Sequence, residues 1–291
     1  MSGRLLELGR ATLDLSGRTH IMGVLNVTPD SFSDGGAFVS SGRIDHSNAV
    51  EHALMMAEDG ADIIDIGGES TRPGSARVDL TEELDRVLPV IDGIKKHSSV
   101  IISVDTCKAA VARAAAQAGA SIINDISGGS LDPDMLYTVR QTGAAFIIMH
   151  MKGTPEDMQS NPVYGDVAVE VRDVLAERAR LAQEEGIPPD KILIDPGIGF
   201  GKTVAHNLAL INRLDTIATL GYPVVLGVSR KTFIGKLTGA ETPSDRLEGT
   251  IASSVIGIVR GASILRVHDV KAVRRACLVA DAVLRADGPI A

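Results

Sequence analysis

The sequence predicts an α/β protein built as a single (β/α)₈ barrel, and three observations support this fold class. Eight short apolar runs recur along the 291 residues, each rich in isoleucine and valine as in strands buried on both faces. Stretches with apolar residues at helical spacing separate these runs. No Gly/Ser-rich or charged linker divides the chain, which favours one domain over residues 1–291.

The expected elements follow one another in a regular order. The stretch "LLELGRATLDLSG", residues 5–17, resembles a small β-hairpin that caps the base of the barrel. The strand-like runs are "IMGVLNV" (21–27), "ADIIDIGG" (61–68), "VIISVDT" (100–106), "SIINDIS" (121–127), "AAFIIMH" (144–150), "KILIDPG" (191–197), "YPVVLGVS" (222–229) and "SILRVHD" (263–269). Helix-like stretches include residues 47–60, 79–97, 107–118, 165–186 and 269–286. Such alternation predicts a parallel sheet that closes into a barrel. An open doubly wound sheet is the alternative, because periodicity alone does not show closure.

Composition and charge argue against several classes of protein. The formal net charge is -8, aromatic residues make up 3% and tryptophan is absent, so we expect no nucleic-acid partner. Cys107 and Cys277 are far apart and lack metal-ligand spacing, which predicts two unpaired thiols in a reducing compartment. The N-terminus lacks the apolar core of a signal peptide, and no segment is long and apolar enough to span a bilayer. We therefore expect a cytoplasmic protein without a membrane partner.

Polar side chains stand at the exits of the strand-like runs. They are Asn26, Asp65, Asp105, Asn124, His150, Asp195, Ser229 and the pair Arg266 and His268. The carboxyl ends of all strands in a barrel meet at one mouth, so these side chains are expected to line one pocket. For any single Asp or Asn, capping of the following helix is the alternative. The set as a whole predicts a catalytic face.

Asp105, Asn124 and Asp195 together offer two carboxylates and an amide that both donates and accepts. Carboxylates pair well with an N–H/NH₂ edge, so these residues are suited to reading the edge of a flat heterocycle such as a pterin. Metal ligation is the competing interpretation. It is weaker because zinc usually takes His or Cys ligands, and no such spacing is present.

Cations follow three of the strand-like runs. Arg72 lies in "GGESTRPG" (67–74), Lys231 in "GVSRK" (227–231) and Arg266 in the last run. Their repeated placement at strand exits predicts binding of anionic groups, with His268 and helix N-termini as further donors. A solvated surface charge is the alternative for each of them.

Several other features resemble functional motifs or residues but are not expected to have those functions. The stretch "DPGIGFGKT" fails the Walker pattern because Pro196 stands where a glycine is needed, so its glycines are expected to let the backbone approach a flat ligand. We expect Lys202 to be a solvated surface charge and Cys107 not to act as a nucleophile. His150 is a candidate for the pocket wall only. The remaining histidines are expected to serve structure or solubility: His20, His46, His52, His97 and His206.

The motifs in this order resemble the dihydropteroate synthase family over nearly the whole chain. They are "MGVLNVTPDSFSDGG", "DIGGESTRPG", "SVDT", "INDISGG", "MHMKGTP", "DPGIGFGK", "GVSRK" and "RVHD", and the first two are highly specific. The resemblance implies a (β/α)₈ barrel, usually dimeric. It also implies condensation of 6-hydroxymethyl-7,8-dihydropterin pyrophosphate with p-aminobenzoate, giving 7,8-dihydropteroate and pyrophosphate in folate biosynthesis.

The resemblance also implies roles for individual residues. Three polar residues would hold the pterin, namely Asp105, Asn124 and Asp195. Three others would frame it, namely Met149, Phe200 and Lys231. Three residues would take the pyrophosphate, namely Arg266, His268 and Asn26. Asn26 would also lie near Mg²⁺, the expected cofactor. Ser229 would meet the p-aminobenzoate carboxylate.

Two loops are expected to cover the site and to take part in the chemistry. Phe32 and Asp34 lie on the first loop, and Thr71, Arg72 and Pro73 lie on the second. Asp34 would stabilise positive charge on the exocyclic carbon as pyrophosphate departs, and Phe32 would shield that carbon from water. The expected catalytic residues are Asp34, Phe32, Lys231 and Arg72. We also expect p-aminobenzoate to bind well only when pterin-site ligand, pyrophosphate and Mg²⁺ are present.

Two other functions are compatible with a pterin pocket. A methyltetrahydrofolate-dependent methyltransferase would share the carboxylates and Asn124 but would not need the two loops or the anion-binding residues. A noncatalytic relative that binds pterin or a partner protein is the second alternative. Retention of every expected site residue argues against it.

Overall fold

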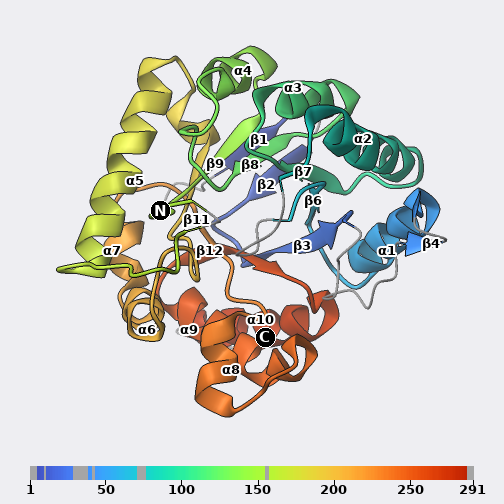
Figure 1. The fold of residues 1–291 in the computed structure, drawn as a ribbon. Coiled ribbons are helices and arrows are strands. Elements are labelled where there is room, and N and C mark those ends of the chain that lie inside the picture. Colours follow the sequence, from blue (N-terminus) through green and yellow to red (C-terminus); the bar gives the residue numbers. More distant parts are fainter. Residues whose placement is uncertain are drawn as a thin grey trace.

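The computed structural model describes residues 5–9, 11–28, 39–40, 43–70, 77–154 and 157–286. Eight parallel strands close into a barrel in the order β10-β11-β12-β3-β6-β7-β8-β9, and helices surround it (Figure 1). The barrel strands are β3 (His20–Asn26), β6 (Ile63–Gly67), β7 (Ile101–Asp105), β8 (Ile122–Asp125), β9 (Ala145–Met149), β10 (Ile192–Asp195), β11 (Val224–Leu226) and β12 (Ala262–Val267). The predicted (β/α)₈ barrel is confirmed. The open sheet is excluded because the first and last strands of this order, β10 and β9, also pair with each other.

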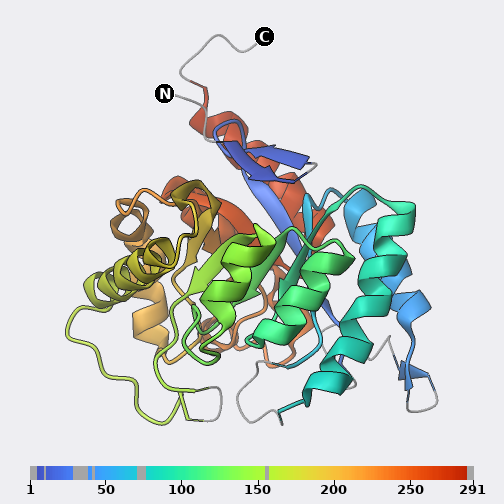
Figure 2. The same ribbon diagram turned by 90° about the horizontal axis from the view of Figure 1, so that it is seen from above.

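The predicted N-terminal hairpin is also present. Strands β1 (Leu5–Leu8) and β2 (Ala11–Asp14) pair antiparallel and lie at one end of the barrel (Figure 2). The inward side chains of the hairpin are Leu6, Leu8 and Leu13, which are buried. They pack against residues near the beginnings of the barrel strands, including Met22, Ile63, Ile101, Ile122 and Ile264. The hairpin therefore covers the amino end of the barrel, whereas the active sites of such barrels lie at the carboxyl end.

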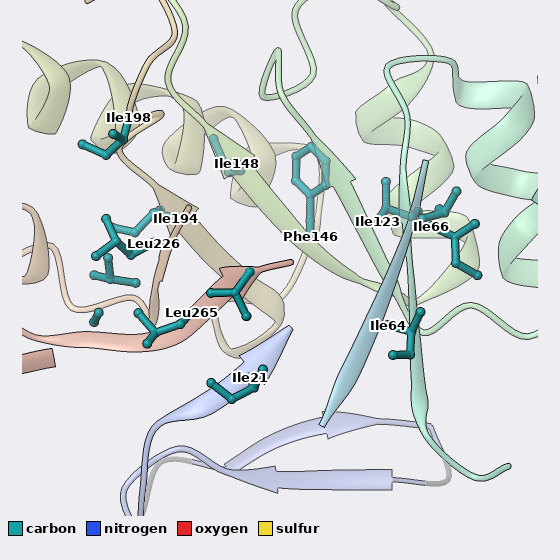
Figure 3. Close-up of a cluster of buried hydrophobic side chains, with 14 of the residues drawn as sticks. Ile21, Ile64, Ile66, Ile123, Phe146, Ile148, Ile194, Ile198, Leu226 and Leu265 are labelled. Carbon is teal, nitrogen blue, oxygen red and sulfur yellow. The ribbon is translucent and has the colours of Figure 1, made fainter. Parts of the chain in front are cut away.

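A ring of helices covers the outside of the barrel. These are α1 (His46–Glu58), α2 (Leu80–His97), α3 (Ala109–Ala118), α4 (Met135–Thr142), α5 (Val167–Glu184), α6 (Val204–Asn212), α7 (Leu214–Ala218), α8 (Thr232–Thr238), α9 (Leu247–Val259) and α10 (Val270–Leu284). Alternate strand residues point outward and pack beneath these helices, as shown by Ile64, Ile66, Phe146, Ile148 and Leu265 in Figure 3. The aliphatic composition suits this layer, because Ile and Val fit the surface of a parallel sheet.

The structure differs from the expected elements mainly at their ends. Strand β11 is three residues long, shorter than the apolar run 222–229, and its register with β12 shifts between Val224 and Val225. A short hairpin of β4 (Val39–Ser40) and β5 (Arg43–Ile44) was not expected. Asp45 caps α1 by accepting from the Asn48 backbone N–H, 3.1 Å away, so this side chain gives α1 a definite start. Within the part of the chain that the structure describes, no helix combines the length and apolar character needed to cross a bilayer.

Candidate active site at the carboxyl end of the barrel

The inside of the barrel changes from apolar to polar along each strand. Because strand side chains alternate, residues two apart share the inner face. On β6 the inner face carries Ile63, then Asp65, then Gly67, while Ile64 and Ile66 belong to the outer core. Three other strands show the same change from an apolar inner residue near the hairpin to a polar one two residues later. The pairs are Ile122 and Asn124 on β8, Leu193 and Asp195 on β10, and Ile264 and Arg266 on β12. The polar residues expected at the strand exits therefore share one end of the barrel.

Arg266 connects several of these residues. Its Nε donates to Asp65 Oδ2 at 2.6 Å, and its Nη2 donates to Asp105 Oδ2 at 2.7 Å. Asn124 Nδ2 also donates to Asp65 Oδ2, at 3.0 Å. Asp65 is completely buried, and its second oxygen, Oδ1, has no hydrogen-bond partner among the described residues. The four side chains form one charged network, and the importance of Asp65 as its centre was not evident from the sequence.

The acids at the mouth are in a strongly desolvated environment. Burial raises the pKa of Asp105 to about 7, although the charge of Arg266 acts in the opposite direction. Burial also raises the pKa of Asp195, against the hydrogen bond that its carboxylate accepts from the Gly197 N–H. Such carboxyl groups gain most from a ligand that donates N–H groups to them, because the ligand replaces the missing water. The geometry therefore favours a bound partner rich in N–H donors.

The segment after β10 turns tightly beside Asp195. Gly197 N–H donates to Asp195 Oδ1 at 2.7 Å, and Gly197 has a φ of 66°, in the left-handed region that favours glycine. A Cβ atom at this position would lie 1.9 Å from the His150 carbonyl oxygen, so no side chain fits. Beyond the turn, Phe200 presents its ring to Lys231, whose Nζ lies 4.3 Å from the ring centroid. Phe200 and Lys231, both expected to frame the pterin, are thus neighbours.

The expectation that Lys202 is a solvated surface charge is wrong. Lys202 is 3% exposed, and its Nζ donates to the carbonyls of Gly197 and Phe200, both at 2.9 Å. The same Nζ lies 2.9 Å from His150 Nδ1. Burial lowers the pKa of Lys202 to about 7, against the attraction of the Asp195 carboxylate. Burial likewise lowers the pKa of His150 to about 3, and the charge of Lys202 acts in the same direction. The sequence could not reveal this, because one Lys after a glycine-rich turn gives no signal of burial.

Ser229 and His268 lie together where the paired strands β11 and β12 end. Ser229 Oγ lies 3.0 Å from His268 Nδ1, and the His268 backbone N–H donates to Ser229 Oγ at 3.2 Å. Between Ser229 and Lys231, Arg230 has a φ of 57°, which is costly for a residue with a side chain. An ion pair with Asp269, with Nη2 and Oδ1 2.6 Å apart, stabilises this conformation. The sequence analysis did not identify Arg230 and Asp269, which fix the path of the "GVSRK" segment.

Two glycines keep space open inside the ring of polar residues. A Cβ atom on Gly67 would lie 3.7 Å from Asn26 Oδ1 and 3.9 Å from Asp105 Oδ2. A Cβ atom on Gly227 would lie 3.9 Å from Arg266 Cβ and 4.0 Å from Asp195 Oδ2. The absent side chains leave room that a ligand can enter from the mouth.

The residues near Gly67 also fit a hard cation such as Mg²⁺. Asn26 and Asp105 face the space beside Gly67 with oxygen atoms, the donor type that Mg²⁺ prefers. The described residues contain no group of three His, Cys, Asp or Glu side chains placed to hold a metal ion. A magnesium ion here would therefore take most of its ligands from water and from an anionic substrate, as Mg²⁺ often does.

Some of the expected site residues cannot be placed. Phe32, Asp34, Thr71, Arg72 and Pro73 lie outside the described residues. Met149 ends β9 and is buried. Cys107 and Cys277 are both free, as expected. Burial raises the pKa of the Cys107 thiol, and the nearby Asp125 adds to this effect, so a reactive thiolate is disfavoured.

A separate cavity of about 390 Å³ lies at the other end of the barrel. It is lined by apolar residues of the hairpin and of the segments before β10 and β11, among them Leu5, Leu15, Pro189 and Tyr222. Asp190 is the only charged residue in this lining. We place the functional site at the carboxyl end, because the convergent buried charges are found there.

Comparisons with known proteins identify the family of this chain. The family described as "Pterin binding enzyme" matches residues 22–268. The dihydropteroate synthase of Escherichia coli is 48% identical over 275 residues, covering 94% of this chain and 95% of that protein. That of Synechocystis is 45% identical over 280 residues, covering 96% and 95%. The Xanthomonas albilineans dihydropteroate synthase solved with 4-aminobenzoic acid has a TM-score of 0.90 at 44% identity, covering 98% of this chain and 99% of that one. The family match includes every described residue of the polar mouth, from Asn26 to His268.

Proposed function

Since this chain belongs to the family of pterin-binding enzymes and acts as a dihydropteroate synthase, we propose that its polar barrel mouth is the site of that reaction. The reaction joins 6-hydroxymethyl-7,8-dihydropterin pyrophosphate to p-aminobenzoate and releases pyrophosphate. The single observation that carries the proposal is the convergence of Asp105, Asn124, Asp195 and Arg266 at the carboxyl end of the barrel. Their buried charges and amide match a flat, N–H-rich ring with an anionic leaving group.

The acids and the amide bind the pterin. Asp195 and Asp105 accept from N–H groups of the ring, which relieves the desolvation that raises the pKa of both carboxyl groups. Asn124 supplies an amide whose Nδ2 already donates to Asp65, so its carbonyl oxygen is directed elsewhere and accepts from the ring. Met149 and the facing pair of Phe200 and Lys231 frame the flat faces of the ring.

Arg266, His268 and Asn26 take the pyrophosphate. Among the described residues, Nε and Nη2 of Arg266 have partners, which leaves Nη1 to donate to a phosphate oxygen. Mg²⁺, held by Asn26 and by pyrophosphate oxygens, would neutralise charge on the leaving group. Ser229, close to His268, is positioned to donate to the carboxylate of p-aminobenzoate.

The bond changes need no strong base. The aniline nitrogen of p-aminobenzoate bonds to the exocyclic carbon of the pterin, and the carbon–oxygen bond to pyrophosphate breaks. The new amine loses one proton, which the released pyrophosphate or water accepts. Positive charge on that carbon grows as the leaving group departs, and an adjacent acid such as Asp34 would stabilise it. Phe32, Thr71 and Arg72 complete the proposed covering loops, and all of these loop residues lie outside the described part of the chain.

We further propose that the enzyme is a homodimer in the cytoplasm. Helices α9 and α10 pack against each other. They expose six large apolar side chains, Ile256, Val259, Leu278, Val279, Val283 and Leu284. A patch of this kind on one face of a protein is typical of an association surface, and a second copy can cover it through a two-fold contact. The two free thiols support a reducing compartment.

An assay of pyrophosphate release tests the proposed reaction. Release should require both the pterin pyrophosphate and p-aminobenzoate, because the amine is the acceptor that captures the exocyclic carbon. Equal release without p-aminobenzoate would indicate a pyrophosphohydrolase, and no release with both substrates would remove the proposal. Product identity is checked by mass spectrometry of 7,8-dihydropteroate.

A further inference from the structure

Lys202 is the only buried lysine among the described residues, and its surroundings match a fixed ammonium group. An ammonium has three N–H donors, and Nζ of Lys202 has three acceptors at 2.9 Å: His150 Nδ1, the Gly197 carbonyl and the Phe200 carbonyl. A weaker contact of 3.4 Å reaches the His150 carbonyl. Each N–H therefore has a partner, which is the condition for burying a charged group at tolerable cost.

The three acceptors come from two neighbouring strand exits. His150 directly follows β9, while Gly197 and Phe200 follow β10, and the two strands are paired. The His150 backbone N–H donates to the Asp195 carbonyl at 3.0 Å, which already holds the two exits together. Lys202 adds a second connection between the two exits, on the segment that carries Phe200. To accept from Lys202, the His150 ring must have a lone pair on Nδ1 and its proton on Nε2.

The tied segment carries two groups of the proposed pterin site. Asp195 stands at its start, where its Oδ1 accepts from Gly197 N–H. Phe200 stands near its end, where its N–H donates to the Gly197 carbonyl at 3.0 Å and its ring faces Lys231. The same Gly197 carbonyl also accepts from Lys202. A shift of the Lys202 side chain would therefore move the turn that sets the distance between Asp195 and Phe200.

We propose that Lys202 is a positioning residue for pterin binding, which acts by fixing the 197–200 turn through His150 and the carbonyls of Gly197 and Phe200. The inference rests on the proposed function, because the turn matters only if Asp195 and Phe200 hold the pterin. In the proposed arrangement Lys202 contacts neither the exocyclic carbon of the pterin nor the amine of p-aminobenzoate. It holds the turn that presents Asp195 and Phe200 to the ligand, so its loss weakens pterin binding more than it slows the chemical step.

The fold does not depend on Lys202 alone. Gln159 Nε2 donates to the Gly199 carbonyl at 2.7 Å, and Tyr164 Oη donates to the Gly201 carbonyl at 2.9 Å. Gly199 N–H donates to Asn207 Oδ1 at 2.7 Å. These contacts hold the same segment without Lys202. A variant without the ammonium should therefore fold, with a turn that is less well fixed.

The test compares Lys202→Met with Lys96→Met in the full chain. Methionine keeps most of the lysine side-chain volume but removes the three donors, and Lys96 is an exposed residue of α2. Calorimetric titration with 6-hydroxymethylpterin should show a dissociation constant raised about tenfold or more by Lys202→Met and unchanged by Lys96→Met. In turnover assays the KM for the pterin substrate should rise while the KM for p-aminobenzoate stays within about twofold. Equal pterin affinity in both variants would overturn the proposal.

Hydrogen exchange separates positioning from a general loss of stability. In Lys202→Met the amides of Gly197, Gly199 and Phe200 should exchange faster, while those of Leu193 and Ile194 in β10 keep their protection. Uniform acceleration over the barrel would show a structural role and would overturn the proposal. If Lys202→Met does not fold, His150→Phe removes one of the three acceptors and should raise the pterin dissociation constant by a smaller factor, about threefold. An unchanged constant in a folded His150→Phe protein would then overturn it.

The wild-type protein distinguishes failure of this inference from failure of the proposed function. If wild type binds 6-hydroxymethylpterin and releases pyrophosphate only with both substrates, a negative result for Lys202→Met removes the positioning role alone. If wild type neither binds the pterin nor turns over, the proposed function fails and the Lys202 inference falls with it.

Discussion

Arg266 and Asp65 form an ion pair inside the barrel mouth, with Nε of the guanidinium 2.6 Å from Oδ2 of the carboxylate. The two residues belong to β12 and β6, which are separated by β3, so the pair reaches across one intervening strand. Asp65 is fully buried and also accepts from Asn124. The Asp65 carboxylate thus orients Arg266, which is proposed to bind pyrophosphate, and Asn124, which is proposed to bind the pterin. Asp65 itself is buried beneath the site.

We predict that Asp65→Asn weakens both substrate contacts. The substitution keeps the shape of the side chain but removes the charge that holds Arg266 and Asn124, and charged hydrogen bonds of this kind contribute about 1.5–3 kcal/mol. Affinity for 6-hydroxymethylpterin should fall about tenfold or more, as measured by calorimetry. Asp92→Asn, on the exposed side of α2, is the matched control. If Asp65→Asn binds the pterin as tightly as wild type, the orienting role of Asp65 is wrong.

Asp195→Ala should abolish measurable pterin binding. The N–H/NH₂ edge of the ring would be buried without its charged acceptor, at a cost of several kcal/mol. Calorimetry against Asp190→Ala, an exposed acid just before β10, provides the comparison. Retained pterin affinity in Asp195→Ala would show that the carboxylate does not hold the ring.

Removal of magnesium should stop turnover reversibly. Chelation with EDTA is expected to abolish pyrophosphate release, and added Mg²⁺ should restore it, because the leaving group then loses and regains its counter-charge. Asn26→Ala should raise the Mg²⁺ concentration needed for half-maximal turnover about tenfold, since one of its few protein oxygen ligands is gone. Full activity in the presence of EDTA, with metal analysis showing none bound, would contradict the assignment.

The base of the barrel should show a pH-dependent stability centred on Asp62. Burial alone would raise the pKa of this carboxyl, but the nearby His20 ring, together with hydrogen bonds from Arg18 and the Ile21 N–H, outweighs it and lowers the pKa to about 2. A folded-state pKa below the unfolded value gives stability that is present above pH 3.8 and is lost as the pH falls toward about 2. The shift corresponds to about 2 kcal/mol.

Urea unfolding of wild type and Asp62→Asn measures this contribution. The difference in unfolding free energy should be about 2 kcal/mol at pH 6 and should shrink steadily below pH 4. Asp92→Asn should follow wild type at every pH. A difference between wild type and Asp62→Asn that stays constant with pH would mean that the ion pairs of Asp62 do not stabilise the fold.

The exposed apolar face of α9 and α10 should mediate dimer formation. A charge in the centre of such a face cannot be desolvated without a partner, so Val279→Glu combined with Val283→Glu should yield a monomer. Analytical ultracentrifugation of wild type should show twice the mass of the variant. Val174→Glu, at an exposed position of α5, tests for nonspecific effects of charge. A wild-type monomer at assay concentrations would remove the homodimer proposal.

The fold class and the end of the barrel that carries the proposed site could both be predicted from the sequence. Eight Ile- and Val-rich runs separated by helical patterns permitted few arrangements, and the expected helices 79–97 and 165–186 agree with α2 and α5 within two residues at each end. The exits of parallel strands meet at one edge, so the sequence positions of Asp105, Asn124 and Asp195 were enough to place them together. These predictions depend on periodicity and chain order, which are local properties of a sequence.

The pairing of side chains and the burial of charges depend on the tertiary structure. Lys202 follows a glycine-rich turn, and the sequence predicted a surface lysine. In the structure, three acceptors from two separate strand exits surround its Nζ. Asp65 reads as one acid among several, yet it receives both Arg266 and Asn124 from strands far away in the sequence. Hydrogen bonds and desolvation depend on distances between segments that the closed barrel brings together, and no pattern along the chain contains those distances.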